Sequence, residues 1–153
     1  MSIDTEAGLG QRSSESRHAG RVAALQMLYQ WEVGRTSPGD SILSYWPAQE
    51  DTASLSEEYR EFANALVRGT TQRVGEIDAL LGQRAQNWRV ERMAVLDRLV
   101  LRLATYELLA EPATPPKVVI NEALELTRQY SGDEAVGFVN GVLDGVRKQL
   151  GRE

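Results

Sequence analysis

The chain has 153 residues, a formal net charge of -5, no cysteine and one histidine. This length suits a single domain, or two small subdomains that share a core. The lack of cysteine excludes disulfides, thiolate metal sites and cysteine nucleophiles, and one histidine gives little support to a histidine metal cluster or a serine protease triad. No apolar run reaches membrane-spanning length and no signal-peptide pattern is present, so we expect a cytoplasmic protein with no membrane association.

The N-terminal part predicts a leader followed by a basic helix start. Residues 1–13 are small and polar and predict a disordered leader. The next segment, SESRHAGRVAALQMLYQWEVG, has apolar residues at helical spacing and ends at Gly34. Arg17 and Arg21 are four residues apart and therefore lie on one side of this helix. Their spacing fits a solvated pair and an RNA contact equally well, and His18 beside them suits a solvated or RNA-facing imidazole better than a catalytic base.

Two helix starts are predicted in the middle of the chain. Asp40 is the expected N-cap of a short helix that Pro47 ends. Ser54 and Glu57 have the spacing of a capping box, which opens a long amphipathic helix.

That long helix contains Gly69 and Gly75, where we expect it to bend or break. A turn around Asn87 leads into residues 91–111, which are nearly apolar enough for a central helix, and Pro112 closes this segment.

The segment from Pro115 to Gly145 predicts two capped helices. The first begins near Pro116 and stops at Ser131 and Gly132. Acidic residues then occupy the first turn of the second helix, where the helix dipole favours negative charge. That second helix carries a glycine every fourth residue, at the cost of about 1 kcal/mol each relative to alanine. We expect close packing of a neighbouring helix against these three glycines, which are Gly137, Gly141 and Gly145.

No window alternates with a period of two over strand length, so we predict an all-α protein of six or seven helices. Residues 14–153 are expected to form one domain, with helical subdomains at 14–86 and 87–150 that share a core. No catalytic, phosphate-loop or metal motif occurs, so we expect no enzyme activity and no cofactor.

Three blocks of the sequence resemble the NusB family of bacterial transcription antitermination factors. They are RVAALQMLYQWE at 21–32, ERMAVLDRLVLRLATYEL at 91–108 and PPKVVINEALELTRQYSGDEAVGFVNGVLDG at 115–145. The last block is the most specific, because it combines KVVINEALELT, the SGDE turn and FVNGVLD in this order. Residues 34–87 match only in helical pattern. The resemblance implies a NusB-like helical bundle of two subdomains.

The resemblance also implies a function. Family members bind the single-stranded boxA element of ribosomal RNA operon transcripts together with NusE, a ribosomal small-subunit protein, and help the RNA polymerase antitermination complex to read through terminators. No reaction is catalysed. The positions that would contact RNA are Arg17, His18, Arg21, Asp133, Glu134 and Phe138. The positions that would contact NusE are Tyr29, Glu91 and Asp97.

Several of these positions also have a plain structural interpretation. Phe138 and Tyr29 suit core packing, and Asp133 with Glu134 suits helix capping. Many relatives start the first helix with a nearly continuous run of arginines, whereas SSES precedes Arg17 in this chain. This chain therefore has less positive charge at the start of the first helix, so we expect tight RNA binding to require NusE.

Two alternatives stay open at this point. One is a homodimeric protein-interaction scaffold, in which the basic helix start and the region around Phe138 are self-association surfaces. The other is a stand-alone relative of the N-terminal RNA-binding domain of ribosomal RNA cytosine methyltransferases. A methyltransferase needs a long α/β domain with a glycine-rich cofactor loop, which is not expected in a chain of this length.

Overall fold

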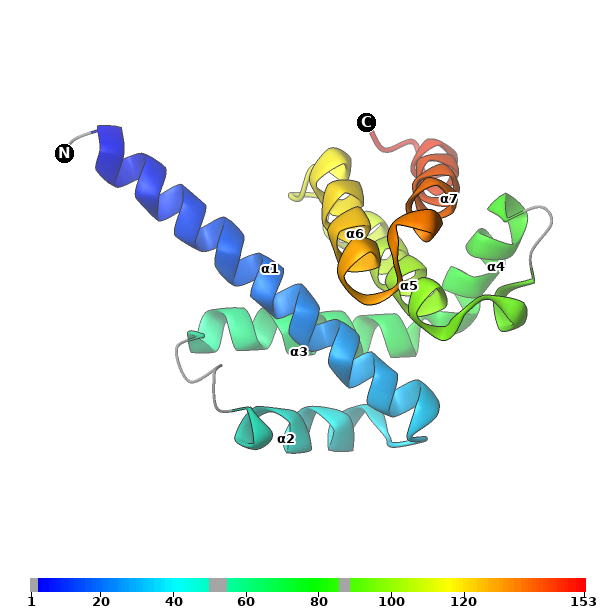
Figure 1. Cartoon of the computed structure of the whole chain (residues 1–153), viewed down its shortest axis with the longest axis horizontal. Coiled ribbons are helices and arrows are strands. Elements are labelled where there is room, and N and C mark those ends of the chain that lie inside the picture. Colours follow the sequence, from blue (N-terminus) through cyan, green and yellow to red (C-terminus); the bar gives the residue numbers. More distant parts are fainter. Residues whose placement is uncertain (1–2, 50–54, 86–88) are drawn as a thin grey trace. The chain divides into compact units, whose positions relative to one another are not determined.

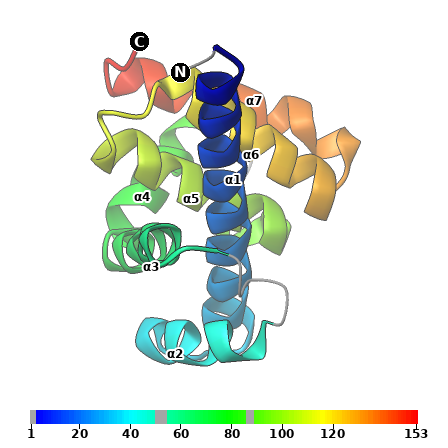
Figure 2. The same ribbon diagram turned by 90° about the vertical axis from the view of Figure 1, so that its left-hand side faces the viewer.

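The computed structural model describes residues 3–49, 55–85 and 89–153. This described part contains seven α-helices, two short 3-10 helices and no strand (Figures 1 and 2). It therefore confirms the all-α prediction and the number of helices. In chain order the elements are α1 Ile3–Val33, α2 Pro38–Ala48, α3 Glu57–Gln72, α4 Val74–Arg84, η2 Val90–Arg92, α5 Val95–Ala110, α6 Pro116–Tyr130, η3 Asp133–Ala135 and α7 Val136–Gln149. None of these helices is both long and apolar enough to cross a membrane.

Two predictions fall on residues outside the described part. The capping box needs Ser54, and the turn before the central helix contains Asn87. The prediction for the N-terminal leader, in contrast, can be compared with the structure, because the described part begins at residue 3. Helix α1 begins at Ile3, so the disorder predicted for residues 1–13 is wrong from that residue onward. No proline interrupts the sequence from Ile3 to Val33, and each residue added to an existing helix gains one hydrogen bond.

The chain divides into two compact units, Met1–Val67 and Arg68–Glu153. The boundary lies inside α3, whereas the sequence predicted it after residue 86. The difference arises from α4, which packs against α5 and α7 and so belongs to the second unit. Sequence periodicity does not show which helices an apolar face will contact, and it therefore put α4 with the elements before it.

In the first unit, α1 packs against α2 through side chains that are almost completely buried. Ser37 caps α2, since its hydroxyl accepts a hydrogen bond from the backbone N–H of Asp40 at 3.1 Å. The prediction of Asp40 as the N-cap is wrong because Pro38 follows Ser37 and starts the helix earlier. Pro47 lies within α2 and does not end it, although the helix continues only to Ala48.

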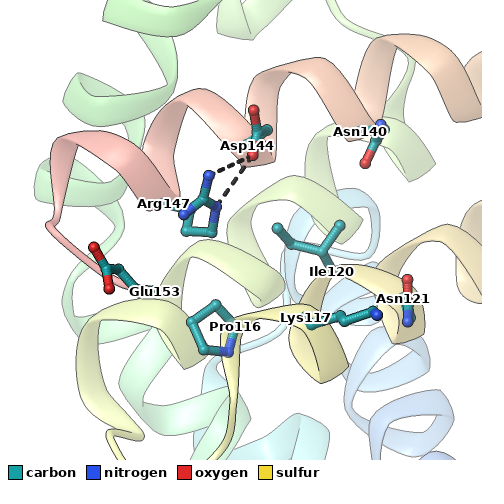
Figure 3. A pocket seen from close by; sticks show the side chains of 8 residues that line it. All are labelled: Pro116, Lys117, Ile120, Asn121, Asn140, Asp144, Arg147 and Glu153. Carbon is teal, nitrogen blue, oxygen red and sulfur yellow. Dashed lines mark hydrogen bonds and ion pairs between the residues drawn. The ribbon is translucent and has the colours of Figure 1, made fainter.

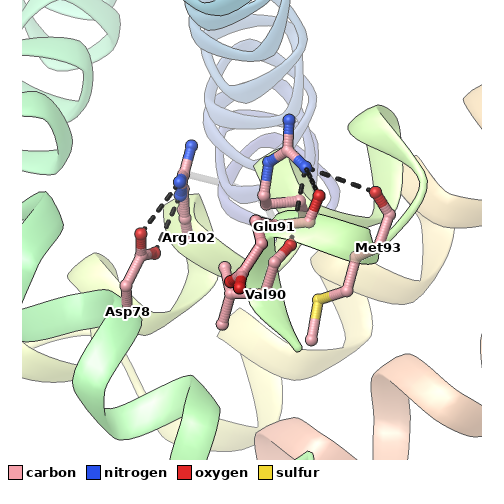
Figure 4. Close-up of polar contacts among 6 residues, drawn as sticks. Asp78, Val90, Glu91, Met93 and Arg102 are labelled. Atoms are coloured by element: carbon pink, nitrogen blue, oxygen red, sulfur yellow. Dashed lines mark hydrogen bonds and ion pairs between the residues drawn. The ribbon is translucent and has the colours of Figure 1, made fainter. Parts of the chain in front are cut away.

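In the second unit, α5 is the central helix and contacts α4, α6 and α7 (Figure 1). Its two arginines are buried and both are bound by oxygen atoms (Figure 4). Arg102 donates to both carboxylate oxygens of Asp78 on α4, from Nε at 2.9 Å and from Nη2 at 2.8 Å. The sequence predicts a nearly apolar central helix here and does not show that its two arginines have buried partners.

The glycines do not behave as their spacing predicted. A Cβ atom at Gly137 or Gly141 would meet nothing within 4 Å, so no helix packs closely against them, and the prediction is wrong there. At Gly145 a Cβ would lie 3.0 Å from Cδ of Arg84, which is a flexible side chain. The close approach occurs instead at Gly69, where a Cβ would lie 1.9 Å from Cζ of Tyr106. Gly69 does not interrupt α3. That helix ends at Gln72 and α4 follows after Arg73, so the break between them lies at neither Gly69 nor Gly75.

Candidate nucleic-acid interface

Three residues predicted to contact RNA lie close together on α1, and we call Arg17, His18 and Arg21 the helix set. Arg17 is exposed, His18 is half-buried, and Arg21 is only 3% exposed. Both arginines lie over the ring of Phe62 on α3, with guanidinium carbons 5.8 Å and 5.3 Å from the ring centroid. The two arginine side chains therefore pack against an aromatic ring. Their conformations are more restricted than those of two solvated arginines would be.

Helix α1 comes very close to this ring. A Cβ atom at Gly20 would lie 2.9 Å from Cδ2 of Phe62, closer than real Cβ contacts come. The absence of a side chain at position 20 therefore lets the ring reach the α1 backbone and lie beneath both arginines. The sequence predicts only an amphipathic helix in this region. It does not reveal the contact, because Phe62 is 41 positions after Arg21 and no local pattern links them.

The other residues predicted to contact RNA lie in the second unit, and we call Asp133, Glu134 and Phe138 the turn set. Gly132 precedes them with a φ of 130°, a backbone conformation that favours glycine. Asp133 and Glu134 are exposed on η3, and Phe138 is half-buried in the first turn of α7. The two carboxylates are thus open to solvent, while Phe138 shares its surface between packing and solvent.

The residues predicted to contact NusE have different environments. Tyr29 on α1 is 41% exposed, and Val33 one turn later is 49% exposed, so this part of α1 presents apolar surface. Glu91 is exposed on η2, whereas Asp97 on α5 is half-buried. The Asp97 carboxylate accepts a hydrogen bond from the Ser131 hydroxyl, which ties the start of α5 to the end of α6.

The short helix η2, which carries Glu91, is hydrogen-bonded through its backbone to a buried arginine. Arg98, 8% exposed, donates from Nη1 to the backbone carbonyls of η2 and the residue after it, and Figure 4 labels the three acceptor residues. The N–O distances are 3.4 Å to Val90, 3.4 Å to Glu91 and 3.3 Å to Met93. These are long hydrogen bonds, but together they fix the backbone from which the Glu91 carboxylate projects.

A hollow of about 310 Å³ lies between α6 and α7, and neither set lines it (Figure 3). Its polar side chains include Asp144, which is bound by Arg147 at 2.9 Å and Lys148 at 3.1 Å. These hydrogen bonds hold the pKa of the Asp144 carboxyl below its usual value. Lys117, Asn121 and Asn140 also line the hollow.

A match to a known protein family shows which family this chain belongs to. The model of the NusB family matches residues 18–148, which is most of the chain. The chain belongs to the NusB family. This places it among transcription antitermination proteins and confirms the resemblance found in the sequence.

Individual relatives agree with this membership over nearly their whole length. The transcription antitermination protein NusB of Koribacter versatilis is 44% identical over 138 residues, which cover 90% of this chain and 92% of the relative. A solved structure of T. maritima NusB has a TM-score of 0.77 and 34% identity, and covers 87% of this chain and 91% of that one. A crystal structure of the antitermination factors NusB and NusE in complex with dsRNA has a TM-score of 0.77 and 26% identity, and covers 88% and 98% of the two chains.

Proposed function

We propose that this protein is a cytoplasmic transcription antitermination factor that binds boxA RNA of ribosomal RNA operon transcripts together with NusE. The observation that carries the proposal is the helix set, in which one ring holds two arginines at the start of a NusB-family fold. The solved complex of a family member with NusE and RNA supports the choice of partners. The protein catalyses no reaction, and its role is to help RNA polymerase read through terminators.

The helix set supplies positive charge for the RNA backbone. A guanidinium donates paired hydrogen bonds that match a phosphate, and Arg17 is exposed and able to do so. Binding that uses such contacts weakens with salt, because the RNA takes back counterions when the protein leaves.

The turn set supplies contacts to the bases. The half-buried ring of Phe138 stacks on an unpaired base, a contact worth about 1 to 3 kcal/mol in other proteins. The exposed carboxylates of Asp133 and Glu134 accept hydrogen bonds from base amino groups. A carboxylate repels phosphate, so these residues favour a base edge over the backbone.

NusE binds through Tyr29, Glu91 and Asp97. The exposed face of Tyr29 is aromatic and amphipathic, which suits a protein interface. Glu91 provides a carboxylate on a turn that Arg98 keeps in place. Because the start of α1 carries few arginines, tight RNA binding requires the NusE complex.

The test is binding of a boxA RNA and a scrambled RNA, each with and without NusE. The variant Arg17→Ala with Arg21→Ala should weaken boxA binding, and the slope of log affinity against log salt should become shallower by roughly 0.7 for each phosphate group that the variant no longer neutralises. The matched control is Arg68→Ala with Arg128→Ala, which removes the same charge from exposed positions outside both sets and should leave affinity nearly unchanged. Equal affinity for the two RNAs in every mixture would refute the proposal.

A further inference from the structure

We propose that Phe62 is a positioning residue for RNA binding, because its ring, which also packs against the buried Arg21, holds the exposed guanidinium group of Arg17 in the orientation that meets the RNA backbone. This inference rests on the proposed RNA-binding function of the helix set. Phe62 itself need not touch RNA. It lies on α3 and is half-buried, with both guanidinium carbons within 5.8 Å of its ring centroid.

The first reason is electrostatic. Two guanidinium groups close to one ring bring two positive charges together, and like charges repel. The face of an aromatic ring carries negative charge from its quadrupole and attracts both cations. The ring therefore makes it possible to concentrate positive charge at one place on α1, which a phosphate group then binds.

The second reason is conformational. A free arginine side chain has several rotatable bonds, and their freedom is lost when the side chain binds a phosphate. Arg21 is already restricted before RNA binds, since it is 3% exposed and lies 5.3 Å above the ring. Arg17 lies on the same ring and is exposed, so its N–H donors are ordered and accessible at the same time.

The third reason is the backbone at Gly20. A Cβ there would lie 2.9 Å from Cδ2 of Phe62, so only the bare α1 backbone allows the ring this close. The ring thus lies against the segment between Arg17 and Arg21, and α3 keeps it there. Any side chain at position 20 would displace the ring or the helix.

Simple core packing is the competing explanation, and substitutions at position 62 separate the two. Phe62→Leu keeps an apolar side chain and removes the quadrupole, and Phe62→Tyr keeps the ring. If Phe62 positions the arginines, Phe62→Leu weakens boxA binding about fivefold or more and makes the salt dependence shallower, while Phe62→Tyr binds within about twofold of wild type. In the Arg17→Ala and Arg21→Ala background, Phe62→Leu has no further effect, because the residues that it positions are gone.

Phenylalanine analogues with one, two and three ring fluorines at position 62 give a second test that keeps the side chain nearly the same size. Each fluorine weakens the quadrupole, so affinity for boxA RNA should fall step by step with unchanged thermal unfolding. This series decides the question if Phe62→Leu does not fold. A flat series, or Phe62→Leu with wild-type affinity and salt slope, overturns the positioning role. If Arg17→Ala with Arg21→Ala binds boxA RNA as tightly as wild type, the proposed function of the helix set fails instead, so the two failures are distinguishable.

Discussion

Gly69 offers the sharpest test of the packing in the second unit. Alanine normally stabilises an exposed helix position by about 1 kcal/mol relative to glycine. At Gly69, however, a Cβ would lie 1.9 Å from Cζ, 2.2 Å from Oη and 2.3 Å from Cε1 of Tyr106. Carbon atoms in contact are normally about 3.5 to 4.0 Å apart, so the ring would have to move by more than about 1 Å. Overpacking of this kind typically costs about 1 to 3 kcal/mol, which outweighs the helix gain.

We therefore expect Gly69→Ala to lower the free energy of unfolding by about 1 to 2 kcal/mol. Urea unfolding followed by circular dichroism measures this change, and thermal unfolding should show a drop of a few degrees, at about 2 to 4 °C per kcal/mol. The matched control is Gly141→Ala, also in a helix but with open space around the position, which should be stabilising by up to about 1 kcal/mol.

A double-mutant cycle identifies the cause. Tyr106→Leu removes the ring, so adding Gly69→Ala to it should become neutral or stabilising. If Gly69→Ala and Gly141→Ala change the stability equally, or if the effect of Gly69→Ala is the same with and without the ring, the assigned steric conflict is wrong.

Three further predictions concern polar contacts. Asp78→Asn should destabilise by about 1 to 3 kcal/mol in chemical unfolding, because it leaves a buried arginine without its charged partner; Glu125→Gln, in an ion pair exposed on both sides, should change stability by less than about 1 kcal/mol. Ser37→Ala should cost about 1 kcal/mol by the same measurement, since it removes the N-cap bond of α2, and no change would contradict that cap. The pKa of Asp144 is depressed in the folded state, so its contribution to stability is present above the unfolded pKa and is lost as the pH falls through the folded pKa; Arg147→Gln should move the Asp144 midpoint upward in a carboxyl NMR titration, and an unmoved midpoint would exclude this pair as the cause.

The residues of the candidate interface differ in how far their roles could be predicted. The pairing of Arg17 with Arg21 on one side of α1 follows from their spacing, and the family resemblance pointed to both of them and to Phe138. Burial of Arg21 against Phe62 could not be predicted, because it depends on a contact between α1 and α3. The hydrogen bond from Ser131 to Asp97 is a contact of the same kind, between the end of one helix and the start of another.

The sequence by itself determined the all-α class, the order of the helices and the family. Apolar periodicity, proline and capping residues act within about four residues along the chain, so their effect is visible without the fold. Only the tertiary structure decided which glycine is indispensable for packing, since Gly69 faces a ring while Gly137 and Gly141 face open space. The same is true of the ring beneath the arginines, because a close approach is set by residues from distant helices and leaves no local pattern.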